Sequence, residues 1–333
     1  MKGFILAAGF GTRLRPITYT LPKPMVPLCN RPLIGWAVDS FLAAGVRDLI
    51  VNVHHLPEPL QEYLREEYAG RAEFHFSIEK EILGTGGGIR RVKPQLANEQ
   101  EFFLVNGDTV QFPRWDALRE ARREKDALAA LTLRHPPEGD RFTPVYFENG
   151  LITGFGSGTG EALMFAGSHV ISTRIFELLP DRDFSGIVEH AYIPNREQQR
   201  LAGIVDDGLW FDIGTPQRYL AASAALLGAT VRGELPLPDG SRIVGNSLMH
   251  VSASGSVVRS TVGAHTVIEG DVRDSIIWDD CQIASGVTLE RCIVAHGVKI
   301  EAGEYRDAVI VPDDARIPDE WERCGPNVIA KPN

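Results

Sequence analysis

The chain has 333 residues, of which 44% are hydrophobic, and this length favours two domains with a sizeable core. Its 34 basic and 44 acidic residues give a net charge of −10, and no basic run of five or more occurs, so nucleic acid is not expected as a main partner. No apolar stretch reaches the roughly 18 residues of a membrane helix, no cleavable signal is recognisable, and the four cysteines lack C-x-x-C spacing. We therefore expect a cytoplasmic protein with reduced thiols and no membrane partner.

The first thirty residues predict a binding site for a chain of phosphates. Lys2 to Ala8 is an apolar run long enough for one buried strand, and a turn containing Gly9 and Gly11 follows it at once. Such a turn exposes several backbone N–H groups at one point, and glycine lets a ligand approach the backbone closely. Arg13 adds a bidentate cation and Lys23 adds a point charge. We interpret this stretch as the site that holds a nucleoside triphosphate.

Two common glycine motifs do not describe this turn. The position three residues past Gly11 is Leu14, so the third glycine of a dinucleotide fingerprint is missing. The chain also contains no Gly-Lys dipeptide, which a P-loop requires. Neither motif accounts for the predicted phosphate site.

The residues after the turn alternate between helical and strand patterns. We predict a helix from Pro32 to Ala44, a buried strand from Leu49 to Val53, an amphipathic helix from Pro57 to Tyr68 and a strand from Glu73 to Ile78. This rhythm implies right-handed crossovers, so the predicted fold class is α/β, with a Rossmann-like, mostly parallel mixed sheet flanked by helices. Ligands of such sheets bind beyond the carboxyl ends of the strands.

A glycine-rich loop is predicted after the strand that ends at Ile78. Four glycines place backbone within reach of a flat ligand such as a nucleobase: Gly84, Gly86, Gly87 and Gly88. The next helix is expected to start near Ile89. A flexible loop without a ligand is the alternative interpretation of the same residues.

Two aspartates are the candidate metal ligands. Asp108 follows an apolar strand, at the carboxyl end where the metal ion of a nucleotide would lie. Asp212 shortly precedes Thr215 and Pro216, which are expected to cap and start a helix that runs to about Leu227. Mg²⁺ takes one or two carboxylates and completes its shell with phosphate oxygens and water. The alternative is that each aspartate only holds its own turn.

The pattern changes after Gly228. Residues 229–240 are rich in glycine and proline and are predicted to be a linker between a catalytic domain, 1–228, and a second domain. Beyond the linker, aliphatic residues recur six positions apart, as in Val262 and Ile268 or Ile277 and Ile283. Such units predict a short parallel β-helix at 241–311, whose exposed ends favour a homo-oligomer. The polar tail at 312–333 receives no function.

The order of these motifs resembles that of the sugar-1-phosphate nucleotidylyltransferases. The stretch LAAGFGTRLRPITYTLPKP, Leu6 to Pro24, is similar to the strand, G-x-G-T-R turn and Pro-Lys of that family. Glu81 to Gly87 is similar to E-x-L-G-T-A-G, with Gly86 in place of the alanine, and Gly208 to Pro216 is similar to G-x-W-x-D-I-G-T-P. The segment SIIWDDCQI, Ser275 to Ile283, resembles the left-handed β-helix coils appended to several members. The layout is most like that of the mannose-1-phosphate guanylyltransferases.

The resemblance implies roles for particular residues. Besides Arg13 and Lys23, the nucleotide would contact a further set: Leu6, Ala8, Gly9, Gly11, Thr12, Glu81 and Gly86. The sugar would rest on the segment around Gly167 and contact Glu189. The Glu-Lys-Pro tripeptide whose lysine contacts the sugar phosphate in the family is absent, since residues 156–163 are GSGTGEAL. No cation can therefore be named for that phosphate, and Glu161 is a candidate contact in its place.

The implied reaction is attack by a sugar 1-phosphate on the α-phosphorus of an NTP, which releases pyrophosphate and forms an NDP-sugar. The nucleophile is already an anion, so positioning and charge stabilisation by Arg13, Lys23, Asp108 and Mg²⁺ would suffice. The resemblance favours a mannose-1-phosphate guanylyltransferase, and a glucose-1-phosphate uridylyl- or thymidylyltransferase, or another sugar-1-phosphate nucleotidylyltransferase, is the alternative. Two other classes stay open: a catalytically silent regulatory subunit that binds a nucleotide-sugar, and an acyltransferase on the β-helix using His250, His265 or His296.

Overall fold

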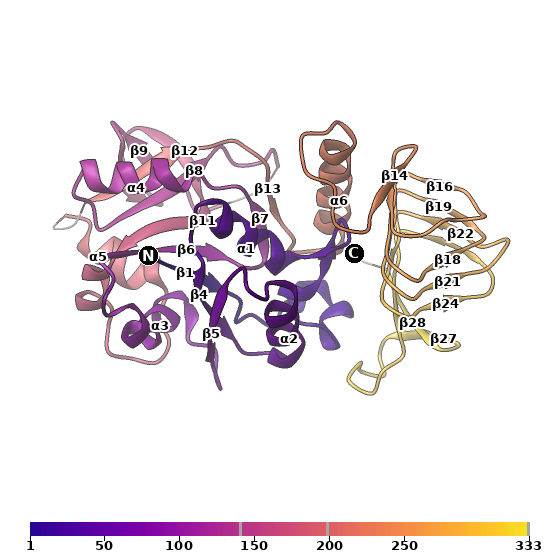
Figure 1. The fold of residues 1–333 in the computed structure, drawn as a ribbon. Helices are drawn as coiled ribbons and strands as arrows, with labels where there is room; N and C mark the ends of the chain where they lie inside the picture. Colours follow the sequence, from indigo (N-terminus) through magenta and orange to yellow (C-terminus); the bar gives the residue numbers. More distant parts are fainter. Residues whose placement is uncertain (140–141, 198–199, 332–333) are drawn as a thin grey trace. The chain divides into compact units, whose positions relative to one another are not determined.

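The computed structural model describes residues 1–139, 142–197 and 200–331, and the chain separates into two compact units. Unit 1 contains Met1–Gly9 and Ile34–Trp210, and unit 2 contains Phe10–Leu33 and Phe211–Asn333. Figure 1 follows the chain by colour from indigo at the N-terminus to yellow at the C-terminus. The predicted phosphate-binding turn is therefore divided: Gly9 belongs to unit 1, whereas the residues from Phe10 onwards belong to unit 2, which also contains the C-terminal third of the chain.

Unit 1 is built on a mixed sheet with the strand order β5-β4-β1-β6-β11-β8-β12-β10-β9. β1 is parallel to β4 and β6, β4 is parallel to β5, and β11 is antiparallel to both β6 and β8, while β8 is parallel to β12. The carboxyl ends of β1, β4, β5, β6, β8 and β12 therefore share one edge of the sheet. The strands are β1 Lys2–Leu6, β4 Asp48–Val53, β5 Glu73–Ile78, β6 Glu101–Asn106, β8 Ala129–Arg134, β9 Val145–Glu148, β10 Leu151–Phe155, β11 Glu161–Ser172 and β12 Leu201–Val205, while the short strand β7, Thr109–Gln111, lies outside this sheet.

Helices pack against this sheet through their apolar side chains. In α4, Trp115 and Leu118 are buried, and the helix contacts β8, β11 and β12. The core of the unit is a continuous cluster that includes Phe4, Ile50 and Leu131 from three different strands. The helices are α1 Leu33–Ala43, α2 Pro57–Glu67, α3 Gly84–Arg91, α4 Trp115–Glu124 and α5 Ile193–Asn195. The predicted Rossmann-like α/β class is confirmed.

Arginines of α4 surround the carboxylate of Glu101 at the amino end of β6. The Glu101 side chain is 3% exposed, and its oxygens accept hydrogen bonds of 2.7 Å from Arg119, Arg122 and Arg123. Burial on its own would raise the pKa of Glu101, but the hydrogen bonds from the three arginines outweigh it and lower the pKa. This cluster fixes α4 to the sheet at the edge opposite the carboxyl ends of the parallel strands.

Unit 2 joins the segment Phe10–Leu33 to the helix α6, Pro216–Val231, and to the C-terminal strands. Thr215 caps α6 by accepting a hydrogen bond from the backbone N–H of Arg218 at 3.3 Å, and Pro216 occupies the first turn, as predicted. The hydroxyl of Tyr219 donates to the carbonyl of Pro27 and accepts from the Trp278 indole at 3.1 Å. Within the segment lie three 3-10 turns, Thr12–Leu14, Ile17–Tyr19 and Lys23–Met25, and the hairpin of β2 Pro27–Leu28 and β3 Arg31–Pro32.

The C-terminal strands of unit 2 form the predicted left-handed β-helix. Val262, Ile277, Val294 and Ile310 follow one another in parallel register and are all buried, so they stack as one aliphatic column. The orange to yellow coils of Figure 1 show this stacking. The strands are β14 Arg242–Val244, β15 Ser247–Met249, β16 Val257–Val258, β17 Thr261–Val262, β18 Val267–Ile268, β19 Asp271–Arg273, β20 Ile276–Ile277, β21 Gln282–Ile283, β22 Thr288–Glu290, β23 Ile293–Val294, β24 Lys299–Ile300, β25 Glu304–Arg306, β26 Val309–Pro312, β27 Glu322–Cys324 and β28 Asn327–Ala330. The short strand β13, Trp210–Asp212, precedes α6 and lies outside these sheets.

Two local predictions are corrected by the structure, and the C-terminal tail, for which no structure was predicted, contains strands. The glycine-rich segment is not a loop before a helix at Ile89, because α3 already begins at Gly84. α6 continues past Leu227 to Val231, so the first residues of the predicted linker are helical. The C-terminal tail contains β27 and β28, and β28 pairs antiparallel with β26. No helix among the described residues is long and apolar enough to cross a membrane.

Candidate active site

A buried polar network holds the loops at the carboxyl edge of unit 1. The side-chain oxygen of Asn52, in β4, accepts a hydrogen bond from the backbone N–H of Ala7 at 2.7 Å. The Asn52 amide donates to Glu79 Oε1 at 2.8 Å, and Glu79 Oε2 accepts from the backbone N–H of Leu83 at 3.0 Å. Asn52 and Glu79 are both almost fully buried. One network therefore ties the residues that follow β1 and β5 to the end of β4.

The sequence reasoning missed both members of this network. It selected Glu81, which is exposed, whereas Glu79 is the carboxylate that fixes the loop. A signal existed for Asn52, because an amide within the apolar strand Asp48–Val53 needs a buried partner. Nothing in the sequence alone distinguished Glu79 from its neighbour Glu81.

The predicted residues at the ends of β1 and β6 lie close to each other. Leu6 is the last residue of β1, and its carbonyl accepts a hydrogen bond from the backbone N–H of Gly107 at 2.8 Å. A Cβ on Gly107 would lie 2.8 Å from Ile5 Cγ2, so only glycine lets this turn pack on β1. Asp108 follows directly and is partly exposed. Ala8 and Gly9, both predicted nucleotide contacts, continue from β1 at the same edge.

The glycines of α3 have a packing role. The backbone N–H of Gly86 donates to the Ser185 carbonyl at 2.7 Å, and a Cβ at Gly86 would lie 2.7 Å from Ser185 Oγ. A Cβ at Gly87 would approach the Asp183 carbonyl to 2.3 Å. The replacement of the family's alanine by Gly86 is therefore explained by the closeness of Ser185.

The predicted sugar-binding residues lie on two further elements of unit 1. Gly167 is in β11 with a φ of +93°, and a Cβ there would lie 2.6 Å from the Asn106 amide nitrogen. A side chain at this position would be both strained and blocked. Glu189 is exposed, in the helical turn Val188–Tyr192. Glu161, the candidate substitute contact, binds His135 Nε2 at 2.9 Å.

Unit 2 places two cations, Lys23 and Arg218, beside the carboxylate of Asp212, and a third, Arg13, next to Gly214. Asp212 Oδ2 accepts a hydrogen bond from Arg218 at 2.8 Å, and Asp212 Oδ1 lies 3.6 Å from Lys23 Nζ. Lys23 is only 5% exposed. A Cβ on Gly214 would lie 3.0 Å from the Arg13 guanidinium, so that glycine leaves room for Arg13. The structure thus brings Lys23 and Asp212 together, with Arg218 as a residue that the sequence reasoning missed.

The turn before this cluster has the geometry that glycine favours. Gly11 has a φ of +61°, and a Cβ there would lie 3.0 Å from Lys23 Cβ and from Thr18 Cγ2. Thr12 and Arg13 follow in the first 3-10 turn. The Gly11 carbonyl accepts a hydrogen bond from Thr18 Oγ1 at 2.9 Å. The turn is therefore held against Lys23, and its cations suit an anionic ligand.

The chemistry of the candidate metal ligands fits a hard divalent cation that shares its shell with a substrate. Among the residues that the structure describes, no group of three or more His, Cys, Asp and Glu side chains could hold a metal ion by itself. Asp108 is partly exposed, and the Asp212 side chain is 18% exposed. Mg²⁺ commonly binds through one or two carboxylates and takes its other ligands from phosphates and water. The two aspartates meet that requirement in type and number.

Comparisons with known proteins match both parts of the chain. Residues 2–155 match the nucleotidyl transferase family, and residues 245–327 match the GlmU-like C-terminal hexapeptide family. A mannose-1-phosphate guanyltransferase of Eremothecium gossypii is 31% identical over 274 residues, 76% of this chain and 72% of that protein. Mannose-1-phosphate guanylyltransferase 1 of Arabidopsis thaliana is 29% identical over 320 residues, 90% of this chain and 83% of that protein.

A solved structure shows the same fold. HddC from Yersinia pseudotuberculosis, complexed with GMP-PN, superposes with a TM-score of 0.57 and 21% identity, covering 68% of this chain and 99% of that one. The chain belongs to the sugar-1-phosphate nucleotidylyltransferase family. It is a nucleotidyltransferase, a class that typically uses a divalent metal ion and for which an NTP and a sugar phosphate are the fitting substrates.

Proposed function

We propose that this enzyme is a mannose-1-phosphate guanylyltransferase, which forms GDP-mannose and pyrophosphate from GTP and mannose 1-phosphate. The observation that carries the proposal is the pairing of Asp212 with Lys23 and Arg218, together with Arg13 beside Gly214 and the glycine turn at Gly11. The choice of guanine and mannose is supported by relatives of that name at about 30% identity over most of the chain. A uridylyl- or thymidylyltransferase acting on glucose 1-phosphate is the alternative.

The nucleotide would lie along the loops after β1 and β5. Leu6, Ala8, Gly9, Gly11 and Thr12 would offer backbone groups to the ribose and phosphates. Arg13 would bind the departing β- and γ-phosphates, and Lys23 would bind the α-phosphate and the incoming phosphate. The base would contact the segment with Glu81 and Gly86, and the sugar would contact Gly167 and Glu189.

We assign a divalent ion, Mg²⁺, to Asp108 and Asp212. When bound, Mg²⁺ neutralises charge on the phosphates and orients them for in-line attack. Arg218 would hold the Asp212 carboxylate in place through its 2.8 Å hydrogen bond. Lys23, near the other oxygen of Asp212, would keep the α-phosphate within reach of the same carboxylate.

The reaction proceeds by displacement at one phosphorus atom. An oxygen of the sugar 1-phosphate dianion forms a bond to the α-phosphorus of the NTP. The bond from the α-phosphorus to the bridging oxygen breaks, and pyrophosphate leaves with the electron pair. Because the nucleophile is already ionised, no side chain must remove a proton. The role of the protein is to align the two substrates and to stabilise the charge that develops on the leaving group.

Domain roles, assembly and compartment belong to the same proposal. Residues 1–228 would carry catalysis, and the β-helix at 241–311 would join copies of the chain into a homo-oligomer, for which the uncovered edge strands are suited. A cytoplasmic location is supported by four cysteines without disulfides, Cys29, Cys281, Cys292 and Cys324, of which the first three are buried.

The proposal is tested by a grid of the four common NTPs and dTTP against the 1-phosphates of mannose, glucose and N-acetylglucosamine, with pyrophosphate release as the readout. We expect magnesium-dependent release, with GTP and mannose 1-phosphate as the best pair. A preference for UTP or dTTP with glucose 1-phosphate would overturn the substrate assignment. No release with any pair, together with binding of nucleotide-sugar, would favour the silent regulatory subunit.

A further inference from the structure

The proposed function requires a cation for the sugar 1-phosphate, and the sheet topology says where to look for it. Within unit 1, the proposed nucleotide contacts Ala8 and Gly9 follow β1 and the proposed base loop follows β5, so the nucleotide uses the β5-β4-β1 half of the carboxyl edge. The second substrate must then lie toward β6, β11, β8 and β12. β11 lies between β6 and β8 and carries Gly167, the predicted sugar contact. A phosphate-binding cation is therefore expected on or beside β8.

Three described basic side chains, Arg114, Arg134 and His135, lie near the carboxyl ends of β8 and β12. Arg114 binds Asp206 Oδ2 at 3.2 Å, so its charge is matched by a carboxylate. His135 lies between Asp207 Oδ2 at 2.7 Å and Glu161 Oε1 at 2.9 Å. The hydrogen bond to Asp207, followed by the one to Glu161, raises the pKa of His135. These two basic side chains are engaged with acidic neighbours.

The third basic side chain, Arg134, is held by backbone carbonyls and an aromatic ring. It is the last residue of β8, and its Nη1 donates to the Gly208 carbonyl at 3.0 Å, while its Nε points to the His135 carbonyl at 3.4 Å. Its guanidinium lies 5.4 Å from the centre of the Trp210 ring, within the range of a cation–π contact. No carboxylate within the described ranges forms an ion pair with it at 4.0 Å or less. Its charge is thus oriented by neutral groups and is not matched by a direct acidic partner.

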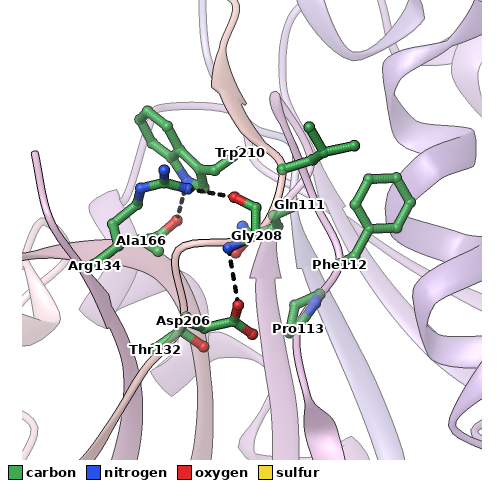
Figure 2. Close-up of a pocket in the computed structure, with 10 residues that line it drawn as sticks. Gln111, Phe112, Pro113, Thr132, Arg134, Ala166, Asp206, Gly208 and Trp210 are labelled. Atoms are coloured by element: carbon green, nitrogen blue, oxygen red, sulfur yellow. Dashed lines mark hydrogen bonds between the residues drawn. The ribbon is translucent and has the colours of Figure 1, made fainter. Parts of the chain in front are cut away.

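Trp210 ties this arginine to the sugar-binding strand. The Trp210 indole N–H donates to the Ala166 carbonyl at 2.8 Å, and Ala166 immediately precedes Gly167. Figure 2 shows Arg134 alongside the Trp210 ring, with Ala166 and Gly208 at the ends of the two hydrogen bonds. The hollow between these residues and Gln111 has a volume of about 20 Å³, the room of one water molecule. A substrate phosphate would therefore rest at the mouth of the hollow, against Arg134, and not inside it.

The electrostatic environment favours binding of an anion by Arg134. Partial burial lowers its pKa, opposed by the charges of Asp207 and Asp206, but a guanidinium stays protonated at neutral pH. A partly desolvated cation interacts more strongly with a phosphate than an exposed one does. Both acidic neighbours have basic partners of their own, Arg114 for Asp206 and His135 for Asp207.

We infer that Arg134 is the residue that binds the phosphate of the sugar 1-phosphate. Neighbouring strands lie about 4.8 Å apart, so β8, two strands from β6, is about 10 Å away from the strand that leads to Asp108. An extended arginine and a hexose phosphate can bridge that distance. The segment where the family places its lysine, residues 156–163, contains no lysine or arginine and supplies no cation. Arg134 thereby takes over a role that the chain cannot fill from that segment.

The competing cation in this region is Arg196. It donates to the Thr153 carbonyl of β10 at 3.1 Å, but its side chain is exposed. β10 is four strands from β6, about 19 Å away at the usual strand spacing, which places it farther from the nucleotide than Arg134. Arg196 is therefore a matched control, an arginine that also donates to a backbone carbonyl.

The test is a steady-state comparison of the full-length wild type with Arg134→Gln, Arg134→Lys and Arg196→Gln. We expect Arg134→Gln to raise KM for the sugar 1-phosphate at least tenfold, with KM for the NTP changed less than twofold. Arg134→Lys should recover part of the affinity, because it restores the charge without the bidentate geometry. Arg196→Gln should resemble the wild type in both constants.

Other outcomes would overturn either the assignment of Arg134 or the proposed function, and they can be told apart. Equal changes in both KM values, or a fall in thermal stability with an unchanged KM for the sugar 1-phosphate, would show that Arg134 only holds the Gly208 loop and would overturn the inference. A sugar-phosphate defect in Arg196→Gln with normal Arg134 variants would assign the role to Arg196 instead. These outcomes leave the proposed function standing, whereas a wild type that releases no pyrophosphate would overturn both.

Discussion

Replacement of Lys23 by methionine separates its catalytic role from its structural one. Lys23 Nζ lies 3.6 Å from Asp212 Oδ1, and only 7% of the lysine side chain is exposed. At an effective dielectric constant of 20, the gross Coulomb attraction at that distance is about 5 kcal/mol. The cost of burying the ammonium offsets most of it, and Asp212 keeps its 2.8 Å hydrogen bond to Arg218, so no carboxylate is left unpaired.

We therefore expect Lys23→Met to lower the free energy of unfolding by only about 1 kcal/mol, or roughly 2–4 °C in Tm. Its effect on catalysis should be much larger. Loss of one charge-stabilising contact costs about 2–4 kcal/mol in the transition state, which corresponds to a fall of about 30- to 900-fold in kcat/KM.

The assay is pyrophosphate release under steady-state conditions, with thermal unfolding measured on the same preparations. Lys2→Met is the control, because Lys2 also forms an ion pair, 2.9 Å to Asp48, but lies at the amino end of β1. The control should lose little stability and no activity. A kcat/KM of Lys23→Met within threefold of the wild type would refute the assignment of Lys23 to the α-phosphate. A fall of more than about 10 °C in Tm would show that the lost activity reflects unfolding.

Three further changes test other parts of the account. Asp108→Asn should retain the wild-type Tm and lose at least about 30-fold in kcat, measured at saturating magnesium; near-normal turnover would remove Asp108 from the metal site. Gly86→Ala should destabilise the protein by about 1–3 kcal/mol in urea unfolding, because its Cβ would lie 2.7 Å from Ser185 Oγ and 3.1 Å from the Ser185 carbonyl oxygen. The second change Ser185→Ala removes only the hydroxyl and should restore part of the loss; no rescue would locate the strain elsewhere. Glu101→Gln should lower the free energy of unfolding by about 2–3 kcal/mol at pH 7 and by less at pH 4. The folded-state pKa of Glu101 lies below its unfolded value of about 4.3, so the charged side chain stabilises the fold above that pH, and this stabilisation is lost as the pH falls through the folded-state pKa. An equal loss at both pH values would contradict the assigned charge on Glu101.

The elements that the sequence predicts well are those with strong, local patterns. The strands after which the ligand loops begin, and the cap of α6 by Thr215 and Pro216, follow from apolar runs and capping chemistry. The β-helix follows from its six-residue repeat, because each unit buries one aliphatic residue regardless of the loop lengths.

The features that the sequence did not predict depend on contacts between distant segments. Helix α3 begins at Gly84, although glycine is a poor helix former, because its backbone packs against residues 183–185. The pairing of Asn52 with Glu79, and of Arg218 with Asp212, likewise joins residues whose spacing carries no motif. Strand β28 forms because its partner β26 supplies the edge on which it pairs. Such tertiary effects override local propensity and leave no periodic signal.

The most direct test of the central claim follows the phosphorus atoms of the nucleotide. The enzyme is incubated with Mg²⁺, mannose 1-phosphate and GTP labelled either at the α- or at the γ-phosphate. We expect the α-label to appear in GDP-mannose and the γ-label in pyrophosphate. Release of the γ-label as inorganic phosphate, or absence of α-label from any nucleotide-sugar with every NTP and sugar 1-phosphate tried, would contradict it.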